Sequence, residues 1–161
     1  MSDPTPQPPA DVIPTTGRLC GIDYGTVRIG VAISDPGQTI SSPLETYQRR
    51  SPKLDAEYFQ KLVEAEQLVG FIVGLPVHMS GEPSQKSKEA IAFGNWLREQ
   101  TEIPVTWIDE RYTTAMAREM LNQSGLSGKK RKAQLDKLAA QILLSVFLES
   151  GPQTEMSPLD P

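Results

Sequence analysis

The stretch LCGIDYGTVRIGVAISD (residues 19–35) holds two runs rich in β-branched and other apolar residues, and these runs meet at a turn around Gly25. Such runs on either side of a glycine turn are typical of a β-hairpin. Asp35-Pro36-Gly37 then leads into a third β-rich run. The sequence therefore predicts an antiparallel β-meander, with strands at residues 19–24, 27–35 and 38–44.

Helical and extended patterns alternate after the meander. Apolar residues recur at helical spacing from Pro52 onward, and Gly70 is expected to close this helix. Two short apolar runs, residues 71–75 and 105–109, are typical of strands buried on both faces, and a helical pattern at residues 84–100 separates them. Alternating strands and helices predict parallel pairing with right-handed crossovers.

Two further helices are expected near the C-terminal end. Thr113 or Thr114 can cap the first, and Gly125 is expected to end it. The second has the clearest pattern in the chain, because apolar residues lie three and four apart from Leu135 to Phe147 and must pack on the sheet. The predicted fold class is α/β, with a mixed central sheet of three antiparallel and two parallel strands flanked by helices.

The chain of 161 residues is long enough for one compact domain. Residues 1–16 and 151–161 are rich in proline and contain no Lys or Arg, so we expect disordered tails there and a folded domain at residues 17–150. Residues 1–16 also lack the basic start and apolar stretch of a signal peptide. No apolar run approaches the roughly 20 residues that cross a bilayer, and we expect a cytoplasmic protein with no membrane partner.

Positive charge is concentrated in one place. The expected tails carry the whole formal net charge of −4, so the predicted domain is neutral. Its basic run, Lys129-Lys130-Arg131-Lys132, is expected to form a loop between two helices and can hold a polyanion through counterion release. Adjacent cations are also common on solvated surfaces, so a mobile loop without a partner is the alternative.

Two acidic residues interrupt or follow expected strands near their carboxyl ends, where ligands collect in open α/β sheets. Asp23 lies inside the first expected strand, on the same face as Gly21. Glu110 directly follows the strand at residues 105–109. Each also has a purely structural interpretation, because Asp23 can cap the turn through nearby amides and Glu110 can be a solvated acid paired with Arg111.

Asp136 completes a possible trio of acids. It lies at the edge of the apolar stripe of the last helix, one turn before Ala140, although an acid near a helix N-terminus is also favourable in itself. Carboxylates that converge from three elements repel one another, and a hard divalent cation relieves this repulsion. Together, Asp23, Glu110 and Asp136 predict a Mg²⁺ or Mn²⁺ site that activates water for phosphodiester cleavage.

Other kinds of catalytic site find little support. His78 is the only histidine, so a zinc site built on several histidines is excluded, and the residue is kept as a minor candidate for a phosphate contact. Cys20 is the only cysteine, which excludes an internal disulfide, and it lies in a strand that we expect to be buried.

Four motifs resemble the YqgF family, also called RuvX, whose members are described as Holliday junction resolvases and as nucleases of pre-16S ribosomal RNA maturation. They are GIDYGTVRIGVAISD (21–35), IVGLP (72–76), DERYTT (109–114) and LDKLAAQILL (135–144), and they cover nearly all of the expected domain. The resemblance implies a ribonuclease H-like fold. It also implies that Asp23 is the first-strand acid, Glu110 the acid of the DER motif and Asp136 the acid of the last helix.

By the same resemblance, Thr26, Arg28 and Arg111 correspond to contacts with substrate or phosphate, and local packing is an alternative explanation for each. The sequence departs from the family at Val77-His78-Met79-Ser80, where Asn, Met and Asp often follow GLP, and at Tyr112, where Leu is frequent. These departures concern loop contacts. The site also offers three carboxylates, whereas many ribonuclease H-like enzymes use four.

The preferred hypothesis is a metal-dependent nuclease that cleaves structured RNA, in 5′-end processing of pre-16S ribosomal RNA. A Holliday junction resolvase is the nearest alternative, but such enzymes act as dimers, whereas we expect a monomer or a weak homodimer. A nucleic-acid-binding module without catalysis is a second alternative. A sugar-kinase-like ATPase conflicts with the length of the chain, because those enzymes usually have two lobes.

Overall fold

Three consecutive strands form the antiparallel meander that the sequence predicts. The computed structural model describes the backbone of residues 10–76, 84–111, 113, 119, 122 and 128–150, and the side chains of these residues except 128–137. The strands are β1 (Arg18–Asp23), β2 (Arg28–Ser34) and β3 (Ser41–Gln48). Each pairs antiparallel with the next.

The third strand begins and ends later than the predicted strand at residues 38–44. Gln38 has a left-handed backbone with a φ of 56°. The Asp35 carboxylate accepts hydrogen bonds from the amides of Thr39 (2.8 Å) and Ile40 (2.9 Å). An aspartate that binds amides farther along the chain stabilises a turn, so strand pairing starts only at Ser41.

A parallel pair extends the sheet beyond β1. The strand β4 (Leu68–Leu75) pairs parallel with β1 and with β5 (Val105–Asp109), and the strand order is β3-β2-β1-β4-β5. The crossovers contain α1 (Pro52–Glu66) and α2 (Gln85–Thr101). The predicted mixed sheet of three antiparallel and two parallel strands is therefore confirmed.

The helix α1 ends before Gly70, which the sequence predicts as its closing residue. Gln67 adopts the left-handed conformation with a φ of 53°, and its amide donates to the carbonyl of Val63. This is the type of C-terminal cap that glycine often provides. Gly70 lies in β4 instead, where an added Cβ would lie 3.2 Å from Cδ2 of Leu19.

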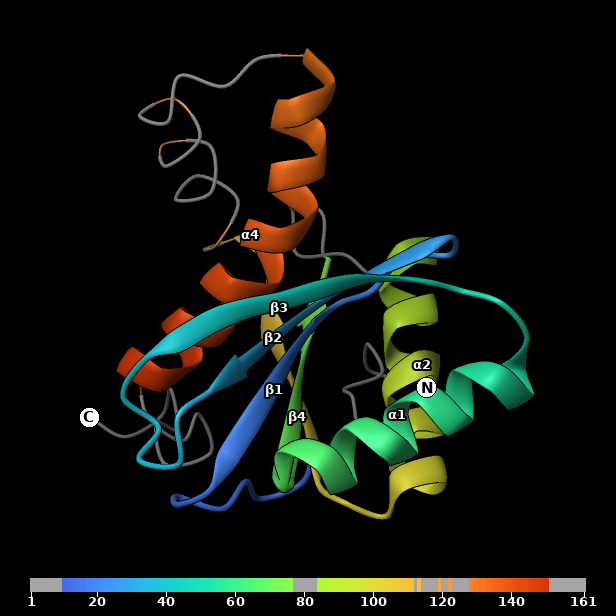
Figure 1. Ribbon diagram of the computed structural model, residues 1–161, viewed down its shortest axis with the longest axis vertical. Helices are drawn as coiled ribbons and strands as arrows, with labels where there is room; N and C mark the ends of the chain where they lie inside the picture. Colours follow the sequence, from blue (N-terminus) through green and yellow to red (C-terminus); the bar gives the residue numbers. More distant parts are fainter. Residues whose placement is uncertain are drawn as a thin grey trace, which may run out of the picture.

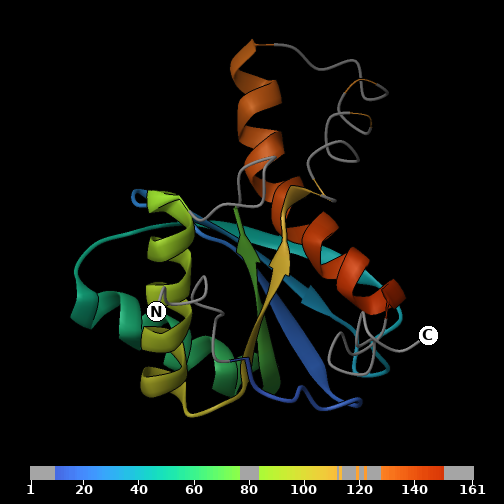
Figure 2. The same ribbon diagram turned by 180° about the vertical axis from the view of Figure 1, so that it is seen from behind.

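Helices α1 and α2 cover one face of the sheet, and α4 (Gly128–Ser150) covers the other (Figures 1 and 2). The core beneath α1 and α2 is aromatic, with Phe59, Phe71, Phe93 and Trp107. The opposite face, called here the α4 face, has a smaller core built from four strands, the helix and the segment before β1. Its buried residues are Ile13, Leu19, Ala32, Ile72, Ile108, Ala140, Leu143, Leu144 and Phe147.

The helix α4 is longer than the predicted last helix and begins at Gly128. The basic run at residues 129–132 therefore lies in the first turns of a helix, and the prediction of a loop between helices is wrong. Lys, Arg, Ala and Gln have high helix propensity, so the helix continues upstream of its apolar stripe. The predicted helix capped by Thr113 or Thr114 lies largely outside the described residues. No helix in the described part of the chain is long and apolar enough to cross a membrane.

Residues 10–16, which precede β1, belong to the folded domain, so the predicted disordered tail over residues 1–16 is wrong for this part. Asp11 accepts hydrogen bonds from Nε of Arg98 (2.6 Å) and from the amide of Val105 (3.0 Å). Ile13 is 5% exposed and packs in the core of the α4 face. Proline disfavours the interior of helices and central strands, but it does not exclude packing against a core. Residues 1–9 and 151–161 lie outside the described residues.

Candidate active site

The α4 face changes from apolar to acidic toward the carboxyl ends of the parallel strands. In β1, Leu19 packs in the core of this face, and an added Cβ at Gly21 would lie 2.9 Å from the carbonyl oxygen of Ala140. Because side chains alternate along a strand, Asp23 lies on the same face, as predicted. In β5, Ile108 packs in the same core, and the next residue of that face is the acid at position 110.

The side chains of Asp23 and Glu110 meet at this edge, where they are in hydrogen-bonding contact. Burial raises the pKa of Glu110 above its ordinary value. The negative charge of Asp109 acts in the same direction, whereas the hydrogen bond with Asp23 and the positive charge of Lys86 act against it. Two carboxyl groups in contact share a proton unless a cation replaces it. The structure therefore brings together two of the three predicted acids.

The two acids reach each other because the strands between and beside them carry glycine. Gly74 lies in β4, between β1 and β5. An added Cβ there would lie 2.3 Å from Oε1 of Glu110 and 3.1 Å from its Cγ, so this side chain lies directly on the β4 backbone. On the other side, Asp23 pairs with Gly30 of β2. Sequence reasoning assigns Gly74 no role, although a glycine at the end of a buried strand is a signal of close approach.

The backbone around Glu110 is also held in place. The Glu110 amide donates to the carbonyl of Leu75 (3.0 Å), and the Glu110 carbonyl accepts from the amide and the hydroxyl of Thr113, both at 3.0 Å. Arg111 forms an ion pair with Asp109, with 2.6 Å between Nη2 and Oδ2. A solvated acid, the structural interpretation of Glu110, does not fit its burial and its contact with Asp23.

The helix α4 leads the third predicted acid toward the same edge. Its C-terminal end lies beside the segment before β1 and the turn between β2 and β3, and its N-terminal half projects beyond the carboxyl ends of β4 and β5 (Figure 2). Position 136 lies one helical turn before Ala140, which approaches Gly21 closely. The backbone thus runs from the core of the α4 face toward the Asp23 edge, and the Asp136 side chain lies outside the described residues.

The residues predicted to contact substrate fall into two groups. Thr26 and Arg28 are exposed, in the turn after β1 and at the start of β2, at the same edge as Asp23. Arg111 follows β5 at this edge as well. The second group is the basic run of Lys129, Lys130, Arg131 and Lys132, whose backbone lies in the first turns of α4 and whose side chains lie outside the described residues. His78, the minor candidate, lies wholly outside the described residues.

Among the side chains that the structure describes, no three His, Cys, Asp or Glu residues are grouped to hold a metal ion. Asp23 and Glu110 supply two carboxylates. The side chain of Asp136, the third predicted ligand, lies outside the described residues and is therefore not among these side chains. Cys20 is fully buried, and burial raises the pKa of its thiol well above the ordinary value. It is therefore an unreactive core residue.

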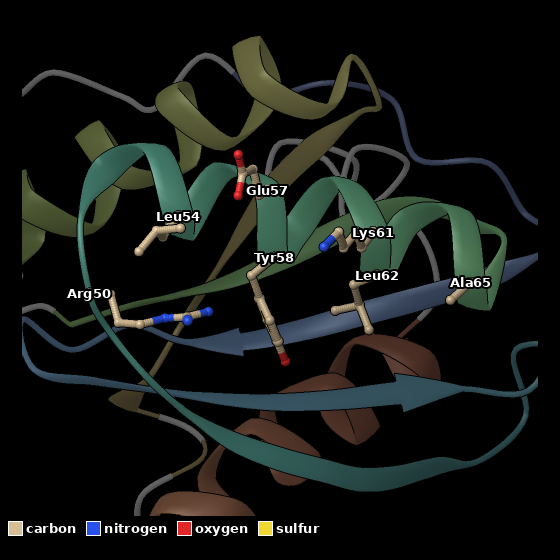
Figure 3. Close-up of a pocket in the computed structure, with 7 residues that line it drawn as sticks. All are labelled: Arg50, Leu54, Glu57, Tyr58, Lys61, Leu62 and Ala65. Carbon is tan, nitrogen blue, oxygen red and sulfur yellow. The ribbon is translucent and has the colours of Figure 1, made fainter.

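A pocket of about 430 Å³ lies away from the acids, beside α1, where Tyr58 and Leu62 point toward the strands (Figure 3). Its lining mixes apolar and charged side chains and includes neither Asp23 nor Glu110. The lining residues are Arg50, Leu54, Glu57, Tyr58, Lys61, Leu62 and Ala65. The pocket and the acidic pair are thus separate features.

Comparison with known proteins gives one family. A family model described as RuvX, Holliday junction resolvase, matches residues 17–150. A curated protein of Rhodopirellula baltica named "Putative pre-16S rRNA nuclease" is 47% identical over 140 residues, which cover 87% of this chain and 81% of that protein. A protein of Neisseria gonorrhoeae with the same name is 39% identical over 136 residues, which cover 84% of this chain and 90% of that protein.

A solved structure of T. thermophilus RuvC in complex with a Holliday junction substrate matches with a TM-score of 0.50 and 13% identity, covering 83% of this chain and 94% of that chain. At this identity the likeness concerns the fold alone, and it confirms the predicted ribonuclease H-like fold. The predicted nuclease class agrees with the names of the family and of the two relatives.

Proposed function

Because this chain belongs to the RuvX Holliday junction resolvase family, as its motifs indicate, we propose that it is a nuclease that hydrolyses phosphodiester bonds with a divalent metal ion. The observation that carries the proposal is the contact between the carboxyl groups of Asp23 and Glu110 at the carboxyl ends of β1 and β5. Asp136 is proposed as the third acid, because α4 runs toward this edge. Water serves as the nucleophile in such an enzyme, so no nucleophilic side chain is needed.

The acidic pair fits Mg²⁺ or Mn²⁺. Both residues supply hard oxygen donors, which these ions prefer. Burial and the nearby charge of Asp109 make ionisation of Glu110 unfavourable without a compensating positive charge. In the proposed site, Asp23, Glu110 and Asp136 would hold the ion, which supplies Lewis-acid activation of the water and the phosphate.

Residues of the chain would handle the proton and the substrate. Burial raises the pKa of Glu110, so the metal-free pair of Asp23 and Glu110 would hold a proton between its two carboxyl groups and release it when a cation is bound. Arg111 is proposed as a phosphate contact, because it follows Glu110 directly and its guanidinium is held by an ion pair with Asp109. Thr26 and Arg28 are proposed as further contacts, since both are exposed at the same edge.

The proposed substrate is structured RNA, specifically the 5′ end of pre-16S ribosomal RNA. The support is the name that two relatives carry, at 47% and 39% identity. Processing of ribosomal RNA would place the protein in the cytoplasm. Cleavage at a single position requires one site, so a monomer or a weak homodimer is sufficient.

The basic run Lys129-Lys130-Arg131-Lys132 is proposed to contact the RNA backbone from the projecting end of α4 (Figure 2). Cations that neutralise phosphates release counterions, which makes RNA affinity depend on salt. Replacing all four residues with Gln should reduce the slope of log affinity against log salt by up to about 3. Fluorescence anisotropy at several salt concentrations measures this slope, and an unchanged slope would remove the run from the interface.

A Holliday junction is the second candidate substrate, because the family model carries that description. Resolving a junction requires two symmetric cuts and therefore a dimer with two-fold symmetry. Binding of nucleic acid without catalysis is the third candidate, since a fold alone does not establish chemistry. Substrate choice and catalysis can be separated in a single set of reactions.

The deciding experiment incubates the purified protein and Mn²⁺ with a pre-16S ribosomal RNA fragment or a four-way DNA junction, and maps the new ends. We expect defined RNA ends, and a rate lowered at least about 100-fold by Asp23→Asn or Asp136→Asn with RNA affinity retained. Glu64→Gln, which changes an exposed carboxylate of α1, is the matched control. It should cleave like the wild type.

Each of the other outcomes would contradict part of the proposal. Equal products from wild type and Asp23→Asn would remove Asp23 from the mechanism. Cleavage of the junction alone, by a stable dimer, would favour the resolvase. RNA binding with no cleavage by the wild type would favour the binding module.

A further inference from the structure

Arg49 lies in the short connection between β3 and α1, beside the turn that follows Asp23. Its backbone amide donates to the carbonyl of Val27 (3.0 Å), which continues the pairing of β2 and β3 by one residue. The backbone of this connection is thereby tied to the β1–β2 turn. The Arg49 side chain contacts two different parts of the fold, the start of α1 and the β1–β2 turn.

In one direction, the guanidinium of Arg49 contacts a buried carboxylate. Its Nε lies 3.2 Å from Oδ2 of Asp55, and Asp55 is only 1% exposed. Burial alone would raise the pKa of Asp55, but hydrogen bonds from Tyr47 (2.6 Å), the Arg50 amide (3.0 Å) and Arg49 outweigh it and hold the pKa below its ordinary value. Asp55 is therefore a fixed, charged anchor at the start of α1.

In the other direction, the same guanidinium contacts the turn itself. Nη1 of Arg49 donates to the hydroxyl of Tyr24 (3.2 Å) and approaches the carbonyl of Gly25 (3.5 Å). The guanidinium also lies 5.5 Å from the centre of the Tyr24 ring and 5.6 Å from that of Phe93. These two rings contact each other, with 4.9 Å between their centres. Arg49 thus holds both residues that follow Asp23.

Resting on the proposed function, we propose that Arg49 is a positioning residue that connects the buried Asp55 to the β1–β2 turn and so fixes the carboxylate of Asp23 for metal binding. A carboxylate at the end of a strand keeps its direction only if the next residues are held. The turn itself is tight, because an added Cβ at Gly25 would lie 2.3 Å from the carbonyl oxygen of Arg28. Residues that orient metal ligands typically change metal affinity 10- to 100-fold when they are replaced.

The neighbouring Arg50 provides a matched control. It carries the same charge one residue farther along the chain, but its guanidinium lies over the Tyr47 ring (5.8 Å) and its side chain extends toward Tyr58 (Figure 3). Arg49→Gln and Arg50→Gln therefore remove the same charge from the same connection, and only Arg49→Gln removes the bridge to the turn. Arg49→Lys keeps the charge but lacks the forked group that reaches both sides.

The test uses the full chain and two measurements. Hydrogen exchange, measured by mass spectrometry without metal, reports the opening of residues 24–28, and calorimetric titration with Mn²⁺ reports metal affinity. Arg49→Gln and Arg49→Lys should both speed exchange in this turn and lower Mn²⁺ affinity about 10-fold or more. Arg50→Gln should match the wild type in both. Thermal unfolding shows whether each variant remains folded.

The outcomes separate this inference from the proposed function. Unchanged exchange in Arg49→Gln overturns the inference whatever the metal result, and so does faster exchange with unchanged Mn²⁺ affinity. Full recovery in Arg49→Lys overturns it too, because charge alone would then suffice. A wild-type protein that binds no Mn²⁺ overturns the proposed function, while the exchange measurement still decides whether Arg49 holds the turn.

Discussion

The carboxyl group of Glu110 is held in a place where a negative charge is unfavourable. Burial raises its pKa, and Asp109 adds like-charge repulsion. A group whose pKa is raised in the folded state stabilises the protein while it is protonated, and this contribution is lost as the pH rises through the folded-state pKa. At neutral pH, the metal-free protein is therefore less stable with Glu110 than it would be with a neutral side chain at this position.

Replacing Glu110 with Gln should stabilise the metal-free protein by about 0.5–2 kcal/mol at neutral pH, because the neutral amide removes the unfavourable ionisation. The difference from wild type should shrink as the pH falls toward the ordinary pKa of glutamate, where both side chains are neutral. Urea unfolding in EDTA at several pH values measures this. Glu64→Gln, at an exposed position, should show no such trend, and a destabilised Glu110→Gln at neutral pH would contradict the argument.

Gly74 offers a complementary change at the same site. An added Cβ would meet the far end of the Glu110 side chain, which can move aside at little cost to the fold. Gly74→Ala should therefore leave the unfolding temperature nearly unchanged but displace the carboxylate and lower cleavage by about 10-fold or more. Parallel measurements of melting and of cleavage rate check both parts. Wild-type cleavage would show that the close approach to β4 has no functional role.

At the scale of elements, the docking of α4 on β1 places the helix that carries Asp136. Gly21 lets the helix approach, because an added Cβ would lie 2.9 Å from the Ala140 carbonyl oxygen and 2.9 Å from Cβ of Leu144. Ser41 of β3 fixes the other side, since its hydroxyl donates to the carbonyl of Gln141 (2.9 Å). The position of α4 is thus determined by backbone and Cβ atoms, which cannot move aside as a flexible side chain can.

Gly21→Ala should therefore destabilise the protein by about 1–3 kcal/mol, as overpacking of a core does. Gly74→Ala is the natural comparison, because it adds the same methyl group on the same face of the sheet but meets the far end of a side chain rather than backbone. Denaturant unfolding of the two variants should separate them clearly. Equal stability would mean that α4 shifts freely, and it would weaken the case for a fixed third ligand.

For the whole molecule, the segment before β1 links parts that are distant in sequence. Asp11 contacts the end of α2 through Arg98 and the start of β5 through Val105, and Ile13 packs between the sheet and α4. Burial alone would raise the pKa of Asp11, but the bonds to Arg98 and Val105 prevail and lower it. The stabilisation from these contacts is present above the ordinary pKa of aspartate and is lost as the pH falls through the folded-state value.

Shortening Ile13 to Ala should cost about 2–4 kcal/mol, because it leaves a cavity in the core of the α4 face. Val12→Ala is the matched control, since Val12 is 76% exposed and should change stability by less than about 0.5 kcal/mol. Thermal and urea unfolding of both variants measure the difference. Equal stability of the two would restore the interpretation of residues 10–16 as a tail outside the fold.

The sequence by itself determined the order of strands and helices and the two acids at strand ends. Hydrophobic periodicity and turn residues are local, so they report which element forms even where a boundary shifts, as at Gln67 or Gln38. The position of Asp23 on the α4 face follows from alternation along β1. The family motifs around Asp23, Glu110 and Asp136 then narrowed the chemistry to a nuclease.

Only the tertiary structure decided which distant residues touch. Glu110 lies on Gly74 because β4 and β5 are neighbours, Arg49 joins Asp55 to the turn after Asp23, and Ile13 enters the core from a proline-rich segment. Such contacts depend on how the elements pack against each other, and no local periodicity encodes packing between segments far apart in the chain. The acids were therefore predictable as candidates, whereas the glycines and the arginine that set their geometry were not.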